Sequence, residues 1–165
     1  MVPEIQHIAI TVEDGSLAVM QFVTKAEFER EATDEAIEAE IVKAGIRAVS
    51  WRRIDIKDLP TSRDFRAAWN YDGKIVDVDM VKAREIHKSR MRAVRTPLLA
   101  AFDVEYQRAD EEEDSEKKAS IVASKQLLRD VTEDPAIAAA KTPEELTAVW
   151  PEILKEKAEK KAEGV

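Results

Sequence analysis

The chain has 165 residues, no cysteine and a formal net charge of −8, with 26 Lys and Arg against 34 Asp and Glu. This length fits one ordinary domain or two small units. The absence of cysteine excludes disulfides and thiolate metal sites. The acidic balance makes nucleic acid an unlikely partner, because it repels phosphate backbones.

The fold class predicted from the sequence is α+β, with a small N-terminal unit over residues 1–79 and a mixed or antiparallel sheet of about four strands. Two runs rich in β-branched residues, 5–12 and 17–23, flank the dipeptide Asp14-Gly15. Such a pair of runs around Asp-Gly is typical of a β-hairpin.

Residues 25–44 predict one broken helix or two short ones. Thr33 is a candidate N-cap, and Gly45 stands where a helix end favours positive φ. The apolar spacing places three side chains on the buried face: Ile37, Ile41 and Ala44.

Two further strands are predicted, over residues 46–54 and 75–79. Between them, residues 61–69 predict a short helix, because Phe65, Ala68 and Trp69 have the spacing of one helix face.

The second half, residues 80–151, predicts an antiparallel helical hairpin followed by a short capped helical segment. Pro97 interrupts the first helix and predicts a kink or a break there. The acidic run 110–114 forms the turn, and Ser115 is expected to cap the second helix. That helix is expected to bury Ile121, Leu128 and Val131.

Two pairs of residues, Asp134-Pro135 and Thr142-Pro143, each predict an N-cap followed by proline in the first helical turn. Residues 152–165 form a charged C-terminal tail with few apolar side chains. No apolar run reaches the roughly 20 residues of a membrane span, and the N-terminus lacks the features of a secretory signal, so we expect no membrane partner.

The sequence offers no catalytic constellation. His7 and His87 lie far apart, and no zinc-binding spacing, nucleophile elbow or glycine-rich phosphate loop is present. Asp77 and Asp79 could hold a cation, but an exposed strand face and a helix cap explain them better. His87 is expected on the polar side of the hairpin. We therefore expect no enzyme, no cofactor and no metal.

A basic stripe is the most suggestive local feature. Residues 82–95 hold six Lys or Arg against Glu85, a net charge of +5 over 14 residues. No Phe, Tyr or Trp lies within it, so contact with protein is favoured over nucleic acid. Alternatively, the stripe pairs with acidic residues of the second helix or of the N-terminal unit, or it is solvated. Trp150, between a short helix and the tail, is a further candidate contact. The predicted partner-binding residues are Arg84, Lys88, Arg92, Arg95 and Trp150.

Short motifs follow one another along the second half: arginines before Leu-Leu and Asp, a later Leu-Leu-Arg-Asp, and a final Trp-Pro. Their positions are Arg92, Arg95, Leu98, Leu99, Asp103, Leu127, Leu128, Arg129, Asp130, Leu146, Trp150 and Pro151. In this order they resemble the phage tail assembly chaperone family, although Val104 stands where that family usually has Trp. Residues 61–69 are similar to a segment that precedes such a helical region in phage-encoded proteins of unknown function.

The resemblance implies a non-catalytic bacteriophage protein that binds a tail or tail-fibre polypeptide. Two roles are open: an assembly chaperone, or a permanent structural component of the virion such as a tail-tip, fibre-network or decoration protein. The chaperone would act in the host cytoplasm during assembly, whereas a structural component would stay in the virion tail. A homo-oligomer is a further arrangement that the sequence leaves open.

Overall fold

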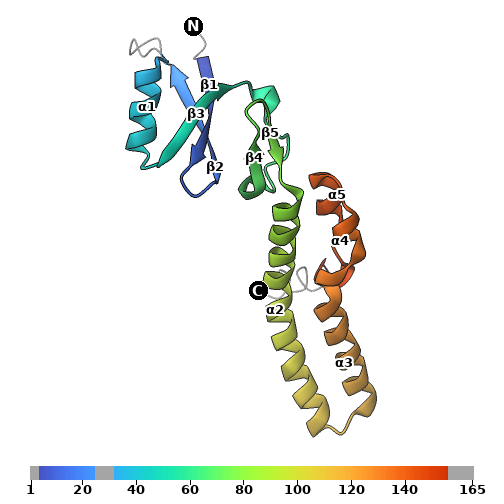
Figure 1. The fold of residues 1–165 in the computed structure, drawn as a ribbon. Coiled ribbons are helices and arrows are strands. Elements are labelled where there is room, and N and C mark those ends of the chain that lie inside the picture. The colour runs from blue at the N-terminus through green and yellow to red at the C-terminus, as the bar shows by residue number, and fades with distance from the viewer. Residues whose placement is uncertain (1–3, 25–31, 156–165) are drawn as a thin grey trace. The chain divides into compact units, whose positions relative to one another are not determined.

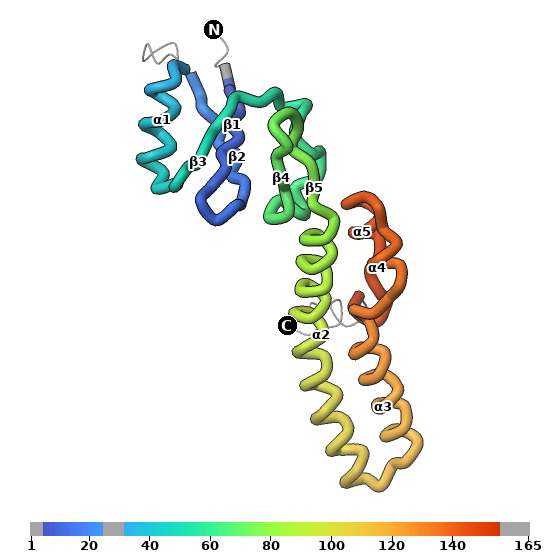
Figure 2. Tube along the Cα trace, in the orientation of Figure 1, coloured from blue at the N-terminus to red at the C-terminus, as the bar shows by residue number. Residues whose placement is uncertain are grey.

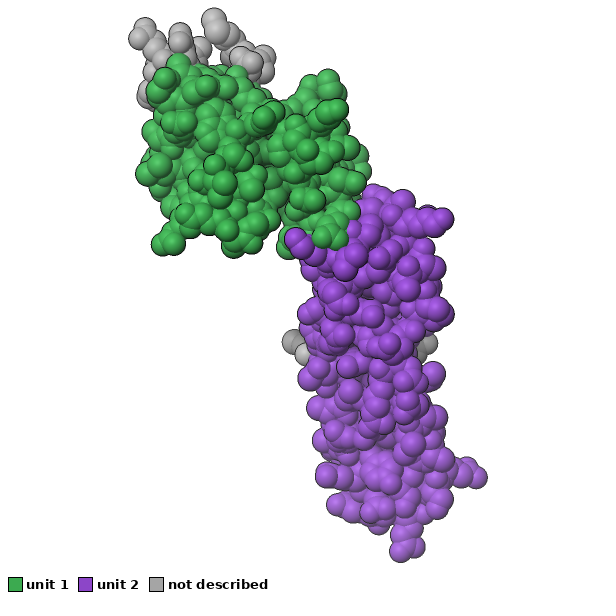
Figure 3. Space-filling view, in the orientation of Figure 1, with its two compact units in different colours: residues 1–79 green, residues 80–165 purple. Residues whose placement is uncertain are grey.

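The computed structural model describes residues 4–24 and 32–155 (Figure 1). The chain divides into two compact units, Met1–Asp79 and Met80–Val165, which Figure 3 shows in separate colours. The α+β prediction is confirmed, because the described strands lie in the first unit and the long helices in the second.

The first unit contains an antiparallel sheet of three strands, β1 (Glu4–Val12), β2 (Leu17–Thr24) and β3 (Ala48–Ile54), in the order β2-β1-β3. The predicted hairpin is therefore confirmed. Its turn is stabilised by a bond from the Ser16 amide to the Asp14 carboxylate, 2.9 Å, and Gly15 has a φ of +78°. A residue with a side chain would be strained at that φ.

Helix α1 (Asp34–Lys43) covers one face of this sheet (Figures 1 and 2). Thr33 caps the helix as predicted, since its hydroxyl accepts a bond from the Ala36 amide at 3.2 Å. Ala44 is exposed, so its predicted burial was wrong: it is the C-cap residue, at the end of the buried face. The core between helix and sheet consists of Ile8, Ile10, Phe22, Ile37 and Ile41.

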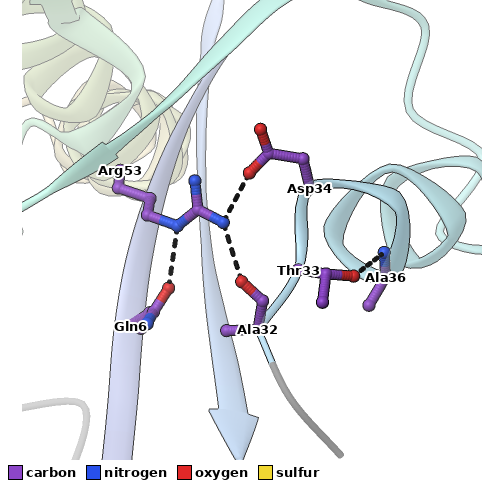
Figure 4. A network of polar contacts seen from close by, with 6 residues as sticks. All are labelled: Gln6, Ala32, Thr33, Asp34, Ala36 and Arg53. Atoms are coloured by element: carbon purple, nitrogen blue, oxygen red, sulfur yellow. Dashed lines mark hydrogen bonds and ion pairs between the residues drawn. The ribbon is translucent and has the colours of Figure 1, made fainter.

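Arg53 joins β3 to β1 and to the start of α1 (Figure 4). Its Nε donates to the side-chain oxygen of Gln6 at 3.0 Å, and its Nη2 donates to the Ala32 carbonyl at 2.7 Å. The same Nη2 lies 2.6 Å from the Asp34 carboxylate. One planar guanidinium thus fixes where the helix begins relative to the sheet. The other predicted helical residues, 25–31, lie outside the described part of the chain.

A second, two-stranded sheet follows, formed by β4 (Trp69–Tyr71) and β5 (Val76–Val78). The prediction that Trp69 belongs to a helix was wrong. Only a 3-10 turn, η3 (Arg66–Ala68), forms, and Trp69 then pairs with Val78. An earlier 3-10 turn, η2 (Ile56–Asp58), lies in the connector after β3. The predicted apolar set is nevertheless buried, because Phe65, Ala68 and Trp69 are each at most 6 % exposed.

The second unit is built on α2 (Met80–Glu111) and α3 (Ser115–Asp130), which lie side by side (Figure 2). Pro97 does not break α2, contrary to one predicted alternative. Pro97 leaves the carbonyl of Ala93 without its usual amide, and both residues are exposed, so water can bond that carbonyl.

Asp114, rather than Ser115, caps α3. Its carboxylate accepts a bond from the Lys117 amide at 2.9 Å. Across the acidic turn, the Lys118 ammonium donates to the Asp110 carboxylate at 2.8 Å, and this bond raises the pKa of Lys118 above its ordinary value. A second bond between the two helices joins Lys125 to Asp103.

Three short elements complete the second unit: η4 (Val131–Glu133), α4 (Pro135–Ala139) and α5 (Pro143–Ala148). Both predicted caps are confirmed, with Asp134 accepting from Ala136 and Thr142 accepting from Glu145. Helix α2 packs against α3, η4 and α5. The buried residues of this unit include Ala83, His87, Met91, Phe102, Ala109, Ile121, Leu128, Val131, Ile137, Leu146 and Leu154. None of the described helices could cross a bilayer, as each is too short or too polar.

Candidate functional site

The described residues contain no group of three or more His, Asp and Glu side chains that could hold a metal ion. Asp77 does not offer a free carboxylate, because its Oδ1 accepts a bond from the Val78 amide at 2.7 Å.

His87 is buried, with 2 % of its surface exposed, so the prediction that it lies on the polar side of the hairpin was wrong. Its Nε2 lies 2.8 Å from the carbonyl oxygen of Val149, within hydrogen-bond distance. The Trp150 ring packs edge-on against it, with 5.6 Å between ring centroids and 71° between ring planes. His87 and Trp150 thus join the end of α5 to α2, and Trp150 is half-buried.

The four predicted contact residues of the basic stripe, Arg84, Lys88, Arg92 and Arg95, do not share one role. Two of them, Arg84 and Arg95, bond backbone carbonyls of the second unit. Arg84 donates from Nε to the Ile137 carbonyl at 3.1 Å and from Nη2 to the Ala140 carbonyl at 2.8 Å. Arg95 donates from Nη1 to the Arg129 carbonyl at 2.9 Å. These carbonyls lie at the C-terminal ends of α4 and α3, where helices lack internal donors and favour cations.

The other two members of the stripe differ from these. Arg92 is exposed. Lys88 is half-buried and, together with Glu133 and Asp134, lines a small cleft of about 220 Å³. The four residues therefore do not form one continuous contact surface.

The different roles predict different costs of substitution. Arg84→Ala should lower the free energy of unfolding by about 1–3 kcal/mol, because two carbonyls lose a charged donor. Arg92→Ala, an exposed position on the same helix, should change it by less than about 0.5 kcal/mol. Urea unfolding followed by circular dichroism measures both. Equal costs would contradict the assignment of Arg84 to the interior bonds of this unit.

An open groove of about 500 Å³ lies at the junction of α3, η4 and the segment after α5. Apolar side chains form much of its lining, and among them Leu127 is 61 % exposed. The apolar lining residues are Leu127, Val131, Pro135, Pro151 and Ile153. Carboxylates form the rest of the lining: Asp130, Glu133, Asp134 and Glu152.

Local bonds hold two of these carboxylates in place. The Asp130 carboxylate accepts from the Gln126 amide at 2.8 and 3.0 Å, and Asp134 accepts from the Ala136 amide at 2.8 Å. Glu152 is paired with Lys155 at 3.0 Å. Among residues 4–24 and 32–155 no Lys, Arg or His lines the groove, so the charge of its described lining is negative.

Sequence reasoning did not find this groove, although it singled out several of its residues. Leu127 and Asp130 belong to the Leu-Leu-Arg-Asp motif and Pro151 to the Trp-Pro motif, which fold to line the same groove. The signal available in the sequence was the excess of acidic and apolar residues around both motifs.

Comparison of the chain with protein-family models, with curated proteins and with solved structures found no match.

Proposed function

We propose that this protein is a non-catalytic phage tail assembly chaperone that holds a segment of a tail or tail-fibre polypeptide in the acidic, apolar groove. The observation that carries the proposal is the groove itself, since residues from two motifs that resemble the chaperone family line one open apolar surface. Exposed apolar surface rimmed by polar groups is typical of protein–protein contact sites.

The lining defines the chemistry of the partner segment. The apolar lining residues favour a segment with aliphatic or aromatic side chains, whose burial supplies most of the binding free energy. The four carboxylates favour Lys or Arg beside those side chains, which increases the association rate and makes it sensitive to salt. The partner is therefore an apolar segment flanked by positive charges, and exposed Arg92 is proposed as a peripheral contact only.

Co-expression with the tail-fibre protein tests this proposal. Leu127→Asp places a charge in the apolar lining of the groove. Because the position is exposed, the fold should survive, while the yield of folded, trimeric fibre falls. Val122→Asp is the matched control, because Val122 is also on α3 and 51 % exposed but does not line the groove. It should leave the fibre yield unchanged.

Three results would refute the proposal. Fibre that folds and trimerises equally well without this chain would exclude a chaperone role. A Leu127→Asp variant that supports fibre assembly as well as the parent would exclude the groove. The third result concerns other occupants of the groove. If Leu127→Asp converts a homodimer to a monomer, the groove binds a second copy of the chain. If the fibre binds only after residues 156–165 are removed, the groove binds the chain's own tail.

The second candidate function is a permanent structural component of the virion. The first unit favours it, because that unit has its own buried core of Ile8, Ile10, Phe22, Ile37 and Ile41, which a helical hairpin does not need. Mass spectrometry of purified particles separates the two roles. Stoichiometric copies in the particle favour the structural role, whereas absence favours a chaperone that leaves after assembly.

A further inference from the structure

The first unit contains a small polar pocket of about 200 Å³ on the side of the sheet opposite α1. His7 and Gln21 line it from β1 and β2, whereas their neighbours Ile8 and Phe22 point to the core under α1. The connector after β3 and the start of β4 supply the other side, with Arg63, Arg66 and Trp69. Val19 and Leu59 complete the lining.

Interactions within the unit hold several of these groups in place. His7 is only 7 % exposed, and its Nε2 lies 3.3 Å from Nε2 of Gln21. Arg66 donates from Nη2 to the Val19 carbonyl at 3.0 Å, and its guanidinium lies 5.9 Å from the centre of the Trp69 ring. A guanidinium has five N–H donors, so this bond uses one of them.

Arg63 is the second cation of the pocket. Among the described residues its side chain has no hydrogen bond or ion pair, and it is exposed. No Asp or Glu in the described part of the chain lines the pocket, although the chain as a whole carries a net charge of −8. Two guanidiniums without a lining carboxylate make this a local positive site on an acidic protein.

Trp69 adds an independent observation. Its indole Nε1 is buried and has no hydrogen-bond acceptor among the described residues. Buried donors are nearly always paired in folded proteins, because an unpaired one is costly. Trp69, which lines the pocket, thus carries a buried donor that no described residue pairs.

We propose that this pocket binds one oxyanion group, a carboxylate or a phosphate, between the guanidiniums of Arg63 and Arg66. Guanidiniums present paired N–H donors that match the two oxygens of such groups. A volume of about 200 Å³ is below the usual 300–1,000 Å³ of sites for larger ligands, so the pocket takes a single group and not a whole nucleotide. The proposal is independent of the groove in the second unit, and it gives a role to residues 61–69, which the hairpin leaves unexplained.

Nuclear magnetic resonance of the full chain tests the proposal, with inorganic phosphate and acetate as the two probes at constant ionic strength. The indole N–H signal of Trp69 and the ring signals of His7 report on the pocket. We expect both to shift and to saturate with at least one probe. Saturation by phosphate alone identifies a phosphate group as the ligand, and saturation by acetate identifies a carboxylate, such as an acidic side chain.

Arg63→Gln is the decisive variant, because this side chain makes no bond that the fold needs. It should weaken anion binding about tenfold or more, the usual effect of losing one charge-assisted hydrogen bond. Arg52→Gln is the matched control, as Arg52 is exposed on β3 and does not line the pocket. Shifts that rise linearly with both anions, or that are equal in the two variants, would overturn the proposal.

Discussion

Leu128→Ala is expected to lower the free energy of unfolding of the second unit by about 2–5 kcal/mol, the usual cost of removing a fully buried leucine side chain. Leu128 is 0 % exposed and lies on the inner face of α3, where no solvent can fill the space left behind. Its neighbour Leu127 is 61 % exposed, so Leu127→Ala should change the same free energy by less than about 0.5 kcal/mol.

Urea unfolding followed by far-ultraviolet circular dichroism measures both variants. The pair is well matched, because the two positions share residue type, helix and substitution. Equal losses, or a larger loss for Leu127→Ala, would mean that α3 is rotated by about one residue, or 100°, from the described orientation.

Phe22→Ala is expected to unfold the first unit at ambient temperature or leave it only marginally stable. Phe22 is 2 % exposed and is the largest of the buried side chains in the core between the sheet and α1. Replacing a buried phenylalanine costs about 3–5 kcal/mol, and small units have little more stability than this to lose. The helices of the second unit should persist, since their core contains none of these residues.

Amide hydrogen exchange distinguishes the two units residue by residue. We expect protection to be lost at β1, β2 and β3 and retained at α2 and α3. Thr11→Ala, a change on the opposite face of β1 at a half-buried position, serves as the control and should keep protection in both units. Loss of protection in α2 and α3 together with the sheet would contradict the independence of the second unit.

The elements of the fold could be predicted where periodicity and capping agree. The hairpin around Gly15, the Thr33 cap and the two Pro-containing caps each depend on residues within a few positions of one another. Trp69 was placed wrongly because its spacing from Phe65 fits a helix, whereas pairing with Val78 makes it a strand residue. The two residues pair across a short hairpin turn at Gly73, and the helix-like spacing from Phe65 concealed this pairing.

The candidate sites were harder to predict for a similar reason. His87 lies four residues from both Ala83 and Met91, so it shares their buried helix face, but its polarity suggested solvent. Arg84 was predicted to contact a partner, yet it bonds two carbonyls of α4 and its C-cap, which composition cannot reveal. The predicted burial of Ile121, Leu128 and Val131 is confirmed and leaves Leu127 exposed. The groove was missed because it also needs residues after α5, such as Pro151 and Ile153.

The short helices α4 and α5 have a consequence for how the chain is made. Their five and six residues are too few for either to be stable alone, so they form only on the surface of α2. The acceptor for His87 is the carbonyl of Val149, 62 positions later in the chain. Synthesis adds about 5–20 residues per second, so the face of α2 that carries His87 is made several seconds before the segment that packs on it. The groove needs Pro151 and Ile153, so the protein cannot engage a partner there until synthesis has passed these residues.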